Sequence, residues 1–291
     1  MITTSPSHSL VHITFIGGGN MGRALISGLL ASGFISEQIS VVEANTLTSD
    51  ALHTSFEVKI IPAVDQIEFD LVKNNVVVMA IKPQDFHLVA KDLRAKFNHP
   101  TGSAPLILSI AAGIRLQDIC RWLAQERCVR AMPNTPALIG QGITGLFANP
   151  NVSAADCALV ETICEAVGQT VWVKEEKLMD AVTAVSGSGP AYVFAFLEAL
   201  QASGEKLGLD TPTARQLAYT TLAGAMQLAE NSPESAGVLR ERVTSKGGTT
   251  AAALDTLKQH DWQGALEAAV AAAYQRGQAL GEELGEDLGN S

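Results

Sequence analysis

The feature that most constrains this chain is a glycine-rich hexapeptide, Gly17-Gly18-Gly19-Asn20-Met21-Gly22, set between two segments of different character. Before it, Val11–Ile16 has the apolar, β-branched composition of a buried strand. After it, Arg23–Ser32 has helical character and ends at Gly33. Glycines at the first, third and sixth positions allow a tight turn, close approach of a pyrophosphate and close packing of helix on strand. A purely structural turn is the alternative, but the strand–turn–helix setting favours a dinucleotide whose phosphates face the helix N-terminus.

The choice of nucleotide depends on the end of a second predicted strand, Ile39–Glu43. Glu43 lies 21 positions after Gly22, where an acid binds the ribose 2′-hydroxyl of NAD, although an ordinary solvated acid is the alternative. NADP favours an arginine here for its 2′-phosphate, and none lies between Glu43 and Lys59. Asn45 and two nearby threonines are neutral donors that could replace it. The residues leave the choice open.

Apolar runs continue through about the first 170 residues. They predict strands at residues 76–81, 106–110 and 128–131, with edge strands at 143–148 and 170–173. Because helical stretches separate these runs, the chain is predicted to have an α/β fold. We expect an open parallel sheet with helices on both faces, in the doubly wound arrangement of Rossmann type.

Turns rich in glycine and proline follow three of these strands, at residues 80–84, 111–113 and 132–136. Ligands of doubly wound sheets lie outside the carboxyl ends of the strands. Ala80, Lys82 and Pro83 of the first turn, and Asn134 of the third, are therefore candidate cofactor residues. Lys82 could contact a ribose or phosphate, and Asn134 could hold the nicotinamide side. A solvated loop lysine and a turn or cap residue are the alternatives.

After Lys174 the pattern changes to long segments rich in alanine and leucine, separated by glycine and proline. Helices are predicted at residues 177–186, 190–207, 212–231, 235–244, 250–258 and 262–283, and no strand is predicted. The chain thus divides into a Rossmann domain over residues 1–173 and an all-helical dimerisation domain over residues 174–291. A helix that is apolar nearly all round, as at Ala268–Ala273, must be buried, so we expect a homodimer.

Charge and composition exclude several classes of function. The net charge of −10 argues against binding of nucleic acid or of an anionic membrane surface. The four cysteines form no Cys-x-x-Cys pair, and the histidines lack metal-ligand spacing, so we expect reduced thiols and no metal site. Met1–Leu10 lacks the features of a signal peptide, and no apolar run is long enough to span a bilayer. A soluble, cytoplasmic protein is expected.

A second glycine-rich loop, Ser245-Lys246-Gly247-Gly248-Thr249-Thr250, lies in the helical half. Its consecutive glycines leave backbone N–H groups uncovered at the predicted start of a helix. Such a position attracts a small anion, and hydroxyl groups beside it add directed hydrogen bonds. On the residues alone, simple capping of the helix by Thr249 and Thr250 explains the pattern as well.

With these motifs placed, the chain resembles the pyrroline-5-carboxylate reductases, the enzymes of the last step of proline biosynthesis. The resemblance covers essentially the whole length. It rests on the first glycine loop and on four further segments, Ala80–Gln84, Arg130–Gly145, Ala184–Tyr192 and Val238–Asp255. The last two are specific, because a generic Rossmann dehydrogenase has no reason to carry them.

The resemblance implies hydride transfer from NADPH, or from NADH, to the C=N carbon of a cyclic imine, which gives L-proline. It also implies helices that interlock in a homodimer and, in many members, a decamer of five dimers. Ser186–Gly189 is then expected close to the nicotinamide or substrate. One departure is Lys246, where the family usually has proline; the lysine adds an N–H and a cation beside the expected carboxylate site.

The resemblance further implies roles for the second loop. The Ser245 hydroxyl and the backbone N–H groups of Gly247, Gly248 and Thr249 would hold the substrate carboxylate. Thr250 is the expected catalytic residue, because its hydroxyl would bond the ring nitrogen and help to deliver a proton.

Two alternatives remain at this stage. A β-hydroxyacid dehydrogenase also joins a Rossmann domain to a helical one, and it needs a lysine base in the helical domain. Lys206 lies on a predicted helix, but no glycine-rich carboxylate motif precedes it. A nicotinamide-binding regulator would keep the first glycine loop and lose the second, whereas this chain retains Ser245–Thr250.

Overall fold

The computed structural model describes residues 11–69, 74–97 and 104–286. The chain forms two compact units. The first unit comprises Met1–Gly187 with Ala273–Ser291, and the second comprises Ser188–Ala272. This division differs from the predicted boundary between residues 173 and 174, because residues 174–187 and the end of the last helix pack with the first unit. The domain boundary itself stays a prediction.

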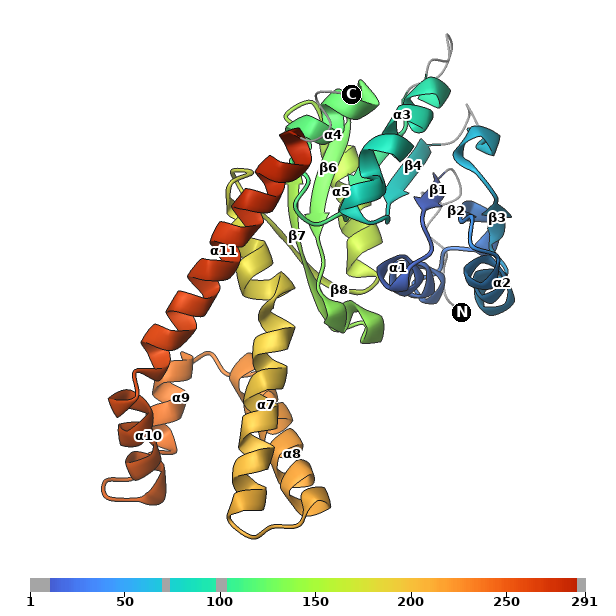
Figure 1. Cartoon of the computed structure of the whole chain (residues 1–291). Coiled ribbons are helices and arrows are strands. Elements are labelled where there is room, and N and C mark those ends of the chain that lie inside the picture. The colour runs from blue at the N-terminus through green and yellow to red at the C-terminus, as the bar shows by residue number, and fades with distance from the viewer. Residues whose placement is uncertain (1–10, 70–73, 98–103, 287–291) are drawn as a thin grey trace. The chain divides into compact units, whose positions relative to one another are not determined.

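The first unit contains an eight-stranded sheet with the order β3-β2-β1-β4-β5-β6-β7-β8 (Figure 1). The strands are β1 (Val11–Ile16), β2 (Ile39–Val42), β3 (Lys59–Ile61), β4 (Asn74–Met79), β5 (Leu106–Ser109), β6 (Cys128–Met132), β7 (Gly142–Ala148) and β8 (Gly168–Trp172). The order of the first six strands is that of a doubly wound sheet, which confirms the predicted fold.

Two details of the predicted sheet are wrong. Neighbouring strands are parallel except β6 and β7, which are antiparallel, so the sheet is mixed. Residues 143–148 were expected at an edge, but β7 pairs with both β6 and β8. The three-residue strand β3 was not predicted, because so short a run carries no readable periodicity.

Helices cover both faces of this sheet. The first unit contains α1 (Asn20–Ala31), α2 (Thr46–Phe56), α3 (Phe86–Phe97), α4 (Leu116–Leu123), α5 (Ala154–Glu165) and α6 (Leu178–Val182). Shorter segments are the 3₁₀ turns Ser36–Gln38, Val64–Gln66, Pro83–Asp85 and Thr135–Ile139, and the π-helical turn Thr183–Gly187. Gly33 has a left-handed φ of 105° just after α1, as predicted for its end.

The core has two parts, one on each face of the sheet. Val76 and Val78 of β4 belong to a cluster with α1, α2 and α5, whereas Val77 and Met79 belong to a cluster with α3 and α4. All four side chains are fully buried. Since successive side chains point to opposite faces of a strand, a continuous apolar run is what a strand covered on both faces requires.

The second unit is helical throughout. It contains α7 (Gly189–Lys206), α8 (Thr211–Glu230), α9 (Ala236–Arg242), α10 (Thr249–Gln259) and the first part of α11 (Trp262–Glu286). Asp210 caps α8 by accepting a hydrogen bond from the Thr213 N–H at 2.8 Å, so α8 begins one residue before the predicted start at Pro212. No helix in the described ranges combines the length and apolar character that a membrane crossing needs.

The second unit leaves many apolar side chains uncovered in the single chain. Among its residues, all of which are described, the buried hydrophobic ones are Leu197, Ala214 and Ala218. Large apolar side chains on α7 and α8 are exposed instead, with Phe194 63% and Met226 62% accessible. A unit of this size needs another surface against which to bury these groups.

Candidate functional site

The first glycine loop joins the end of β1 to the start of α1. Gly17 has a left-handed φ of 94°, and its N–H donates to the Val42 carbonyl at 2.9 Å. A Cβ at Gly17 would lie 2.7 Å from the Ala80 carbonyl oxygen, and one at Gly22 would lie 3.0 Å from the Gly17 oxygen. Gly17 therefore requires glycine, Gly22 is crowded, and the turn after β4 brings Ala80 against the loop.

The space around Gly19 is open, in contrast to the crowded surroundings of Gly17. It is the N-cap of α1, without a side-chain cap, and a Cβ built there meets no atom within 4 Å. The first turn of α1, which contains Asn20 and Met21, carries no acidic residue. The N–H groups of such a turn have no intrahelical partner and attract an anion. The loop thus fits a dinucleotide pyrophosphate.

Glu43, directly after β2, binds the backbone beside this loop through both carboxylate oxygens. Oε2 accepts from the Gly18 N–H at 3.0 Å, and Oε1 accepts from the Asn45 N–H at 2.9 Å. Asn45 caps α2, because its Oδ1 accepts from the Thr48 N–H at 3.0 Å. The predicted cofactor residue Asn45 therefore lies next to the glycine loop and is connected to it through Glu43.

The turn after β4 contains the other predicted residues of this region. The Ala80 N–H donates to the Ile16 carbonyl at 2.9 Å, which ties the turn to the end of β1. Lys82 is exposed and precedes the 3₁₀ turn Pro83–Asp85, in which Pro83 takes the first position. Proline is favoured there because it has no N–H to leave unpaired.

Asn134, which follows β6, has protein partners for both ends of its amide. Its Oδ1 accepts from the Ile143 N–H at 2.9 Å, and its Nδ2 donates to the Ser186 carbonyl at 3.3 Å. Ser186 lies in the π-helical turn, where its own Oγ is buried without a hydrogen-bond partner. The predicted helix over 177–186 thus ends in a π-turn, a feature that is common at functional sites. A Cβ at Gly187 would lie 2.6 Å from Met132 Cε.

The second glycine loop precedes α10 in the second unit. Gly247 has a left-handed φ of 72°, and the Gly248 N–H donates to the Ser245 carbonyl at 3.0 Å. Gly248 is the N-cap of α10, without a side-chain cap. Thr249 and Thr250 are therefore the first two helical residues and not caps. The uncapped first turn keeps N–H groups free for an anion.

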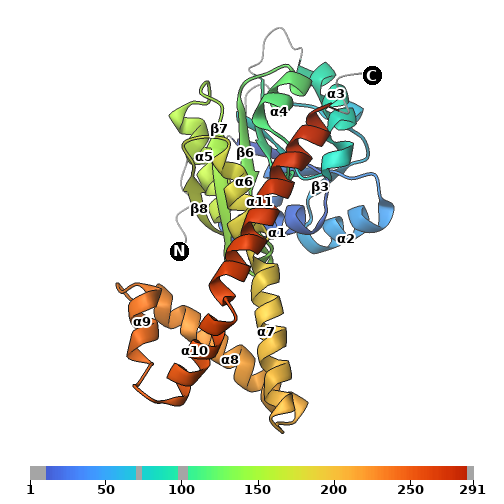
Figure 2. The same cartoon turned by 60° about the vertical axis from the view of Figure 1, so that its left-hand side comes forward.

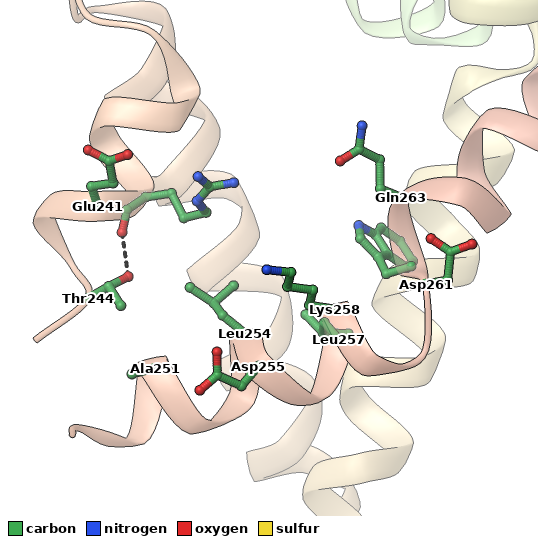
Figure 3. A pocket seen from close by; sticks show the side chains of 11 residues that line it. Glu241, Thr244, Ala251, Leu254, Asp255, Leu257, Lys258, Asp261 and Gln263 are labelled. Atoms are coloured by element: carbon green, nitrogen blue, oxygen red, sulfur yellow. Dashed lines mark hydrogen bonds between the residues drawn. The ribbon is translucent and has the colours of Figure 1, made fainter. Parts of the chain in front are cut away.

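A pocket of about 800 Å³ lies between α9, α10 and the start of α11 (Figure 3). Its lining includes Thr244 and Ala251, which flank the second loop, but none of Ser245–Thr250. Leu254 and Trp262 contribute apolar surface to it. The pocket is therefore distinct from the predicted carboxylate site.

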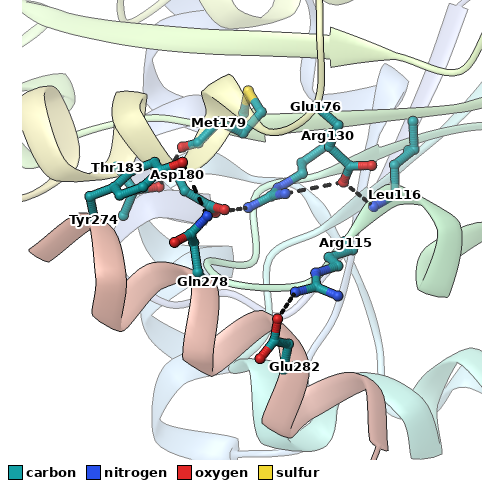
Figure 4. A network of polar contacts seen from close by, with 10 residues as sticks. All are labelled: Arg115, Leu116, Arg130, Glu176, Met179, Asp180, Thr183, Tyr274, Gln278 and Glu282. Carbon is teal, nitrogen blue, oxygen red and sulfur yellow. Dashed lines mark hydrogen bonds and ion pairs between the residues drawn. The ribbon is translucent and has the colours of Figure 1, made fainter.

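A buried arginine to which the sequence motifs assign no role organises another part of the first unit (Figure 4). Arg130 of β6 pairs with Glu176 at 3.1 Å and with Asp180 at 3.4 Å. Glu176 also accepts from the Leu116 N–H. The carboxyl end of α11 lies beside α4 (Figure 2), and there Arg115 pairs with Glu282 at 3.2 Å. In the sequence, the sign of this network is the charged Arg130 within the otherwise apolar strand Cys128–Met132.

The described residues contain no group of three or more histidine, cysteine, aspartate or glutamate side chains placed to hold a metal ion. The four cysteines are free thiols.

Residues 176–280 match a family described as pyrroline-5-carboxylate reductase dimerisation, and residues 12–113 match one described as NADP oxidoreductase coenzyme F420-dependent. The chain is 41% identical to the pyrroline-5-carboxylate reductase of Pseudomonas aeruginosa, over 92% of this chain and 96% of the relative. It is likewise 41% identical to that of Haemophilus influenzae, over 91% of this chain and 96% of the relative.

Solved structures agree with these relatives. A pyrroline-5-carboxylate reductase from Coxiella burnetii superposes with a TM-score of 0.86 at 37% identity, covering 94% of this chain and 99% of that one. Plasmodium falciparum pyrroline carboxylate reductase with NADP bound has a TM-score of 0.80 at 27% identity, covering 93% and 98%.

Proposed function

The chain belongs to the pyrroline-5-carboxylate reductase family, and from this premise we propose how its residues carry out the reaction. The reaction is hydride transfer from NAD(P)H to the C=N bond of 1-pyrroline-5-carboxylate, which gives L-proline in the last step of proline biosynthesis. The observation that carries this conclusion is the 41% identity to a reductase over 92% of the chain. The cofactor-type match at residues 12–113 and the dimerisation match at 176–280 agree with it.

The first unit holds the cofactor. The backbone around Gly17, Gly19, Asn20, Met21 and Gly22 binds the pyrophosphate at the N-terminus of α1, where a Cβ at Gly19 would meet nothing. Asn45 lies on the adenosine side, beside the carboxylate of Glu43. The turn residues Ala80, Lys82 and Pro83, together with Asn134, line the path toward the nicotinamide. The bound cofactor supplies the hydride.

The second glycine loop holds the substrate. The Ser245 hydroxyl and the N–H groups of Gly247, Gly248 and Thr249 bind the carboxylate, and the Thr250 hydroxyl bonds the ring nitrogen. Two features support this assignment. The glycines leave the first turn of α10 without a side-chain cap, and Thr250 is half-buried at the second position of this helix. A protonated imine is already electrophilic, so orientation and one donor are what the protein must provide.

The chain works as a homo-oligomer, since it carries the dimerisation domain of its family. The exposed apolar side chains of the second unit and the open pocket between α9, α10 and α11 are the surfaces that a second copy covers. A decamer of five dimers is the larger assembly we propose. The free cysteines agree with a cytoplasmic location, because thiols stay reduced there.

An assay with purified protein tests this function directly. Oxidation of NADH or NADPH is followed in the presence of 1-pyrroline-5-carboxylate, and L-proline is identified by chromatography. In a parallel assay, 3-hydroxyisobutyrate with NAD tests the β-hydroxyacid dehydrogenase alternative. We expect turnover in the assay with the cyclic imine and a reduced cofactor, and none in the assay with 3-hydroxyisobutyrate and NAD. If the imine is reduced neither with NADH nor with NADPH, the reductase assignment is refuted.

A further inference from the structure

We propose that Glu43 determines the cofactor preference of this enzyme by favouring NADH over NADPH. The inference rests on the proposed function for the location of the cofactor. It goes beyond that function by choosing between two dinucleotides that differ in a single 2′-phosphate.

The position of the carboxylate is the first argument. Glu43 directly follows β2, at the carboxyl edge of the sheet and beside the glycine loop, where an acidic residue of a dinucleotide site reaches the adenosine ribose. A Cβ at Gly18 would lie 2.3 Å from Leu52 Cδ1 and 3.4 Å from Glu43 Oε2. Leu52 therefore excludes a side chain at Gly18, and the carboxylate of Glu43 lies in contact with the loop at this residue.

The carboxylate is also held in place. Each of its oxygens accepts one backbone hydrogen bond, from Gly18 and from Asn45. These bonds orient the group and fix its position beside the loop. A free surface acid could swing away from an incoming phosphate, whereas Glu43 would have to give up both bonds to do so.

The chemistry of the two riboses then differs at this carboxylate. An ionised carboxylate only accepts hydrogen bonds, and each oxygen of Glu43 keeps lone pairs for a further donor. The 2′- and 3′-hydroxyls of NADH are donors and fit it. A 2′-phosphate carries about −1.5 to −2 charges near neutral pH and offers mainly acceptors, so it meets Glu43 with like charge.

The surroundings do not offset that repulsion. Neither an arginine nor a lysine occurs between Glu43 and Lys59, and no ion pair joins Glu43 to a basic side chain in the described residues. The Arg23 guanidinium lies over the ring of Phe56, the last residue of α2, at 6.0 Å from the ring centroid. What remains near the start of α2 is a set of neutral donors, and Asn45 Oδ1 already occupies the Thr48 N–H.

The test measures binding of NADH and NADPH by isothermal titration in the absence of substrate, and kcat/KM with the cyclic imine for each cofactor. We expect the native enzyme to favour NADH by roughly tenfold or more in both readouts. Glu43→Gln keeps the shape of the side chain and removes its charge, and it should shift the ratio toward NADPH by roughly tenfold. Asp50→Asn is the matched control, since Asp50 is exposed on α2, and its ratio should not change.

Tighter binding of NADPH than of NADH by the native enzyme would overturn the proposal, as would a ratio that Glu43→Gln changes by less than about twofold. If that variant does not fold, titration of the native enzyme with ADP-ribose and with its 2′-phosphate decides instead. Preferential NADH binding without imine reduction would refute the proposed function but support this role of Glu43. Imine reduction with a preference for NADPH would support the proposed function and refute this role of Glu43.

Discussion

Thr250 is the residue on which the proposed chemistry depends most. As the second residue of α10 it cannot act as the N-cap, a position that belongs to Gly248. Its half-buried side chain follows a loop whose glycines leave backbone N–H groups uncovered. The capping explanation that the residues alone allowed is therefore not the one realised in the fold.

Replacement of this hydroxyl tests its role. Thr250→Ala is expected to lower kcat by roughly tenfold to a thousandfold, because a single donor to the reacting group is lost, with little change in cofactor affinity. Steady-state kinetics and cofactor titration measure the two effects separately. Thr256→Ala, the same change later in α10, is the control, since the Thr256 hydroxyl only bonds the Ala252 carbonyl at 3.0 Å. Unchanged turnover in Thr250→Ala would refute the assignment.

Asp156 shows how a single ion pair makes stability depend on pH. Its carboxylate accepts from Nε of Arg127 at 2.9 Å and also from Nη2, and its N–H donates to Ser153 Oγ, the cap of α5, at 3.1 Å. The hydrogen bond from Arg127 lowers the pKa of Asp156 below its ordinary value, against the opposing effect of burial. Because the folded pKa is depressed, the stabilisation is fully present above the unfolded pKa of about 3.9 and is lost as the pH falls through the folded value.

Asp156→Asn is therefore expected to lower the free energy of unfolding by about 2 kcal/mol near neutral pH. The difference from the native protein should shrink below about pH 4, where the native carboxylate is protonated as well. Urea unfolding of both proteins at several pH values measures this. Asp92→Asn, at an exposed position of α3, is the control. If the difference in the free energy of unfolding between the two proteins does not vary with pH, the ion pair between Arg127 and Asp156 does not contribute to stability.

At the scale of elements, the strand–turn–helix unit could be predicted because its determinants are local. The spacing of glycines, the apolar run before them and the helical segment after them lie within residues 11–33. The short strand β3 escaped prediction for the opposite reason: three residues of a half-buried edge depend on their neighbour β2 for identity. Likewise the π-turn at Thr183–Gly187 is read from sequence as the end of an ordinary helix.

The two glycines of this unit should respond differently to the same substitution. Gly17→Ala is expected to lower the free energy of unfolding by roughly 2 kcal/mol or more, because of its left-handed φ and the 2.7 Å contact with Ala80. Gly19→Ala should change stability by less than about 1 kcal/mol, since its Cβ meets nothing. It should nevertheless weaken cofactor binding by roughly tenfold, because the methyl group occupies the approach of the pyrophosphate. Chemical unfolding and cofactor titration measure both effects, and equal loss of stability in the two variants would contradict this reading of the loop.

At the scale of the whole molecule, we expect the second unit to need a second copy of the chain. Phe194 and Met226 are more than half exposed in the single chain, and the small apolar segment at Ala268–Ala273 is largely exposed as well. The apolar segment at Ala268–Ala273 had predicted a homodimer, because a helix that is apolar nearly all round must be buried. The dimerisation family match agrees with it.

Dilution tests the importance of the partner. We expect activity per chain to fall as the protein is diluted until light scattering reports a monomer, because uncovered apolar surface destabilises the helices that hold the second glycine loop. Addition of cofactor at saturating concentration controls for simple loss of bound nucleotide. A monomer with full activity would contradict the requirement for a second copy.

The residues alone predict most strands and helices, the two glycine loops and the family resemblance, because each of these depends on residues that are neighbours along the chain. The packing of distant segments was needed to show that Glu43 Oε2 accepts from Gly18 of the glycine loop, that Arg130 pairs with Glu176 and Asp180, and that residues 273–286 return to the first unit. The hydrogen bonds of Glu43 and Arg130 join residues 25, 46 and 50 positions apart. Arg115 and Glu282, which tie the last helix to the first unit, lie 167 positions apart. Whether such groups meet depends on strand order and helix packing, which the periodicity of a single segment does not encode.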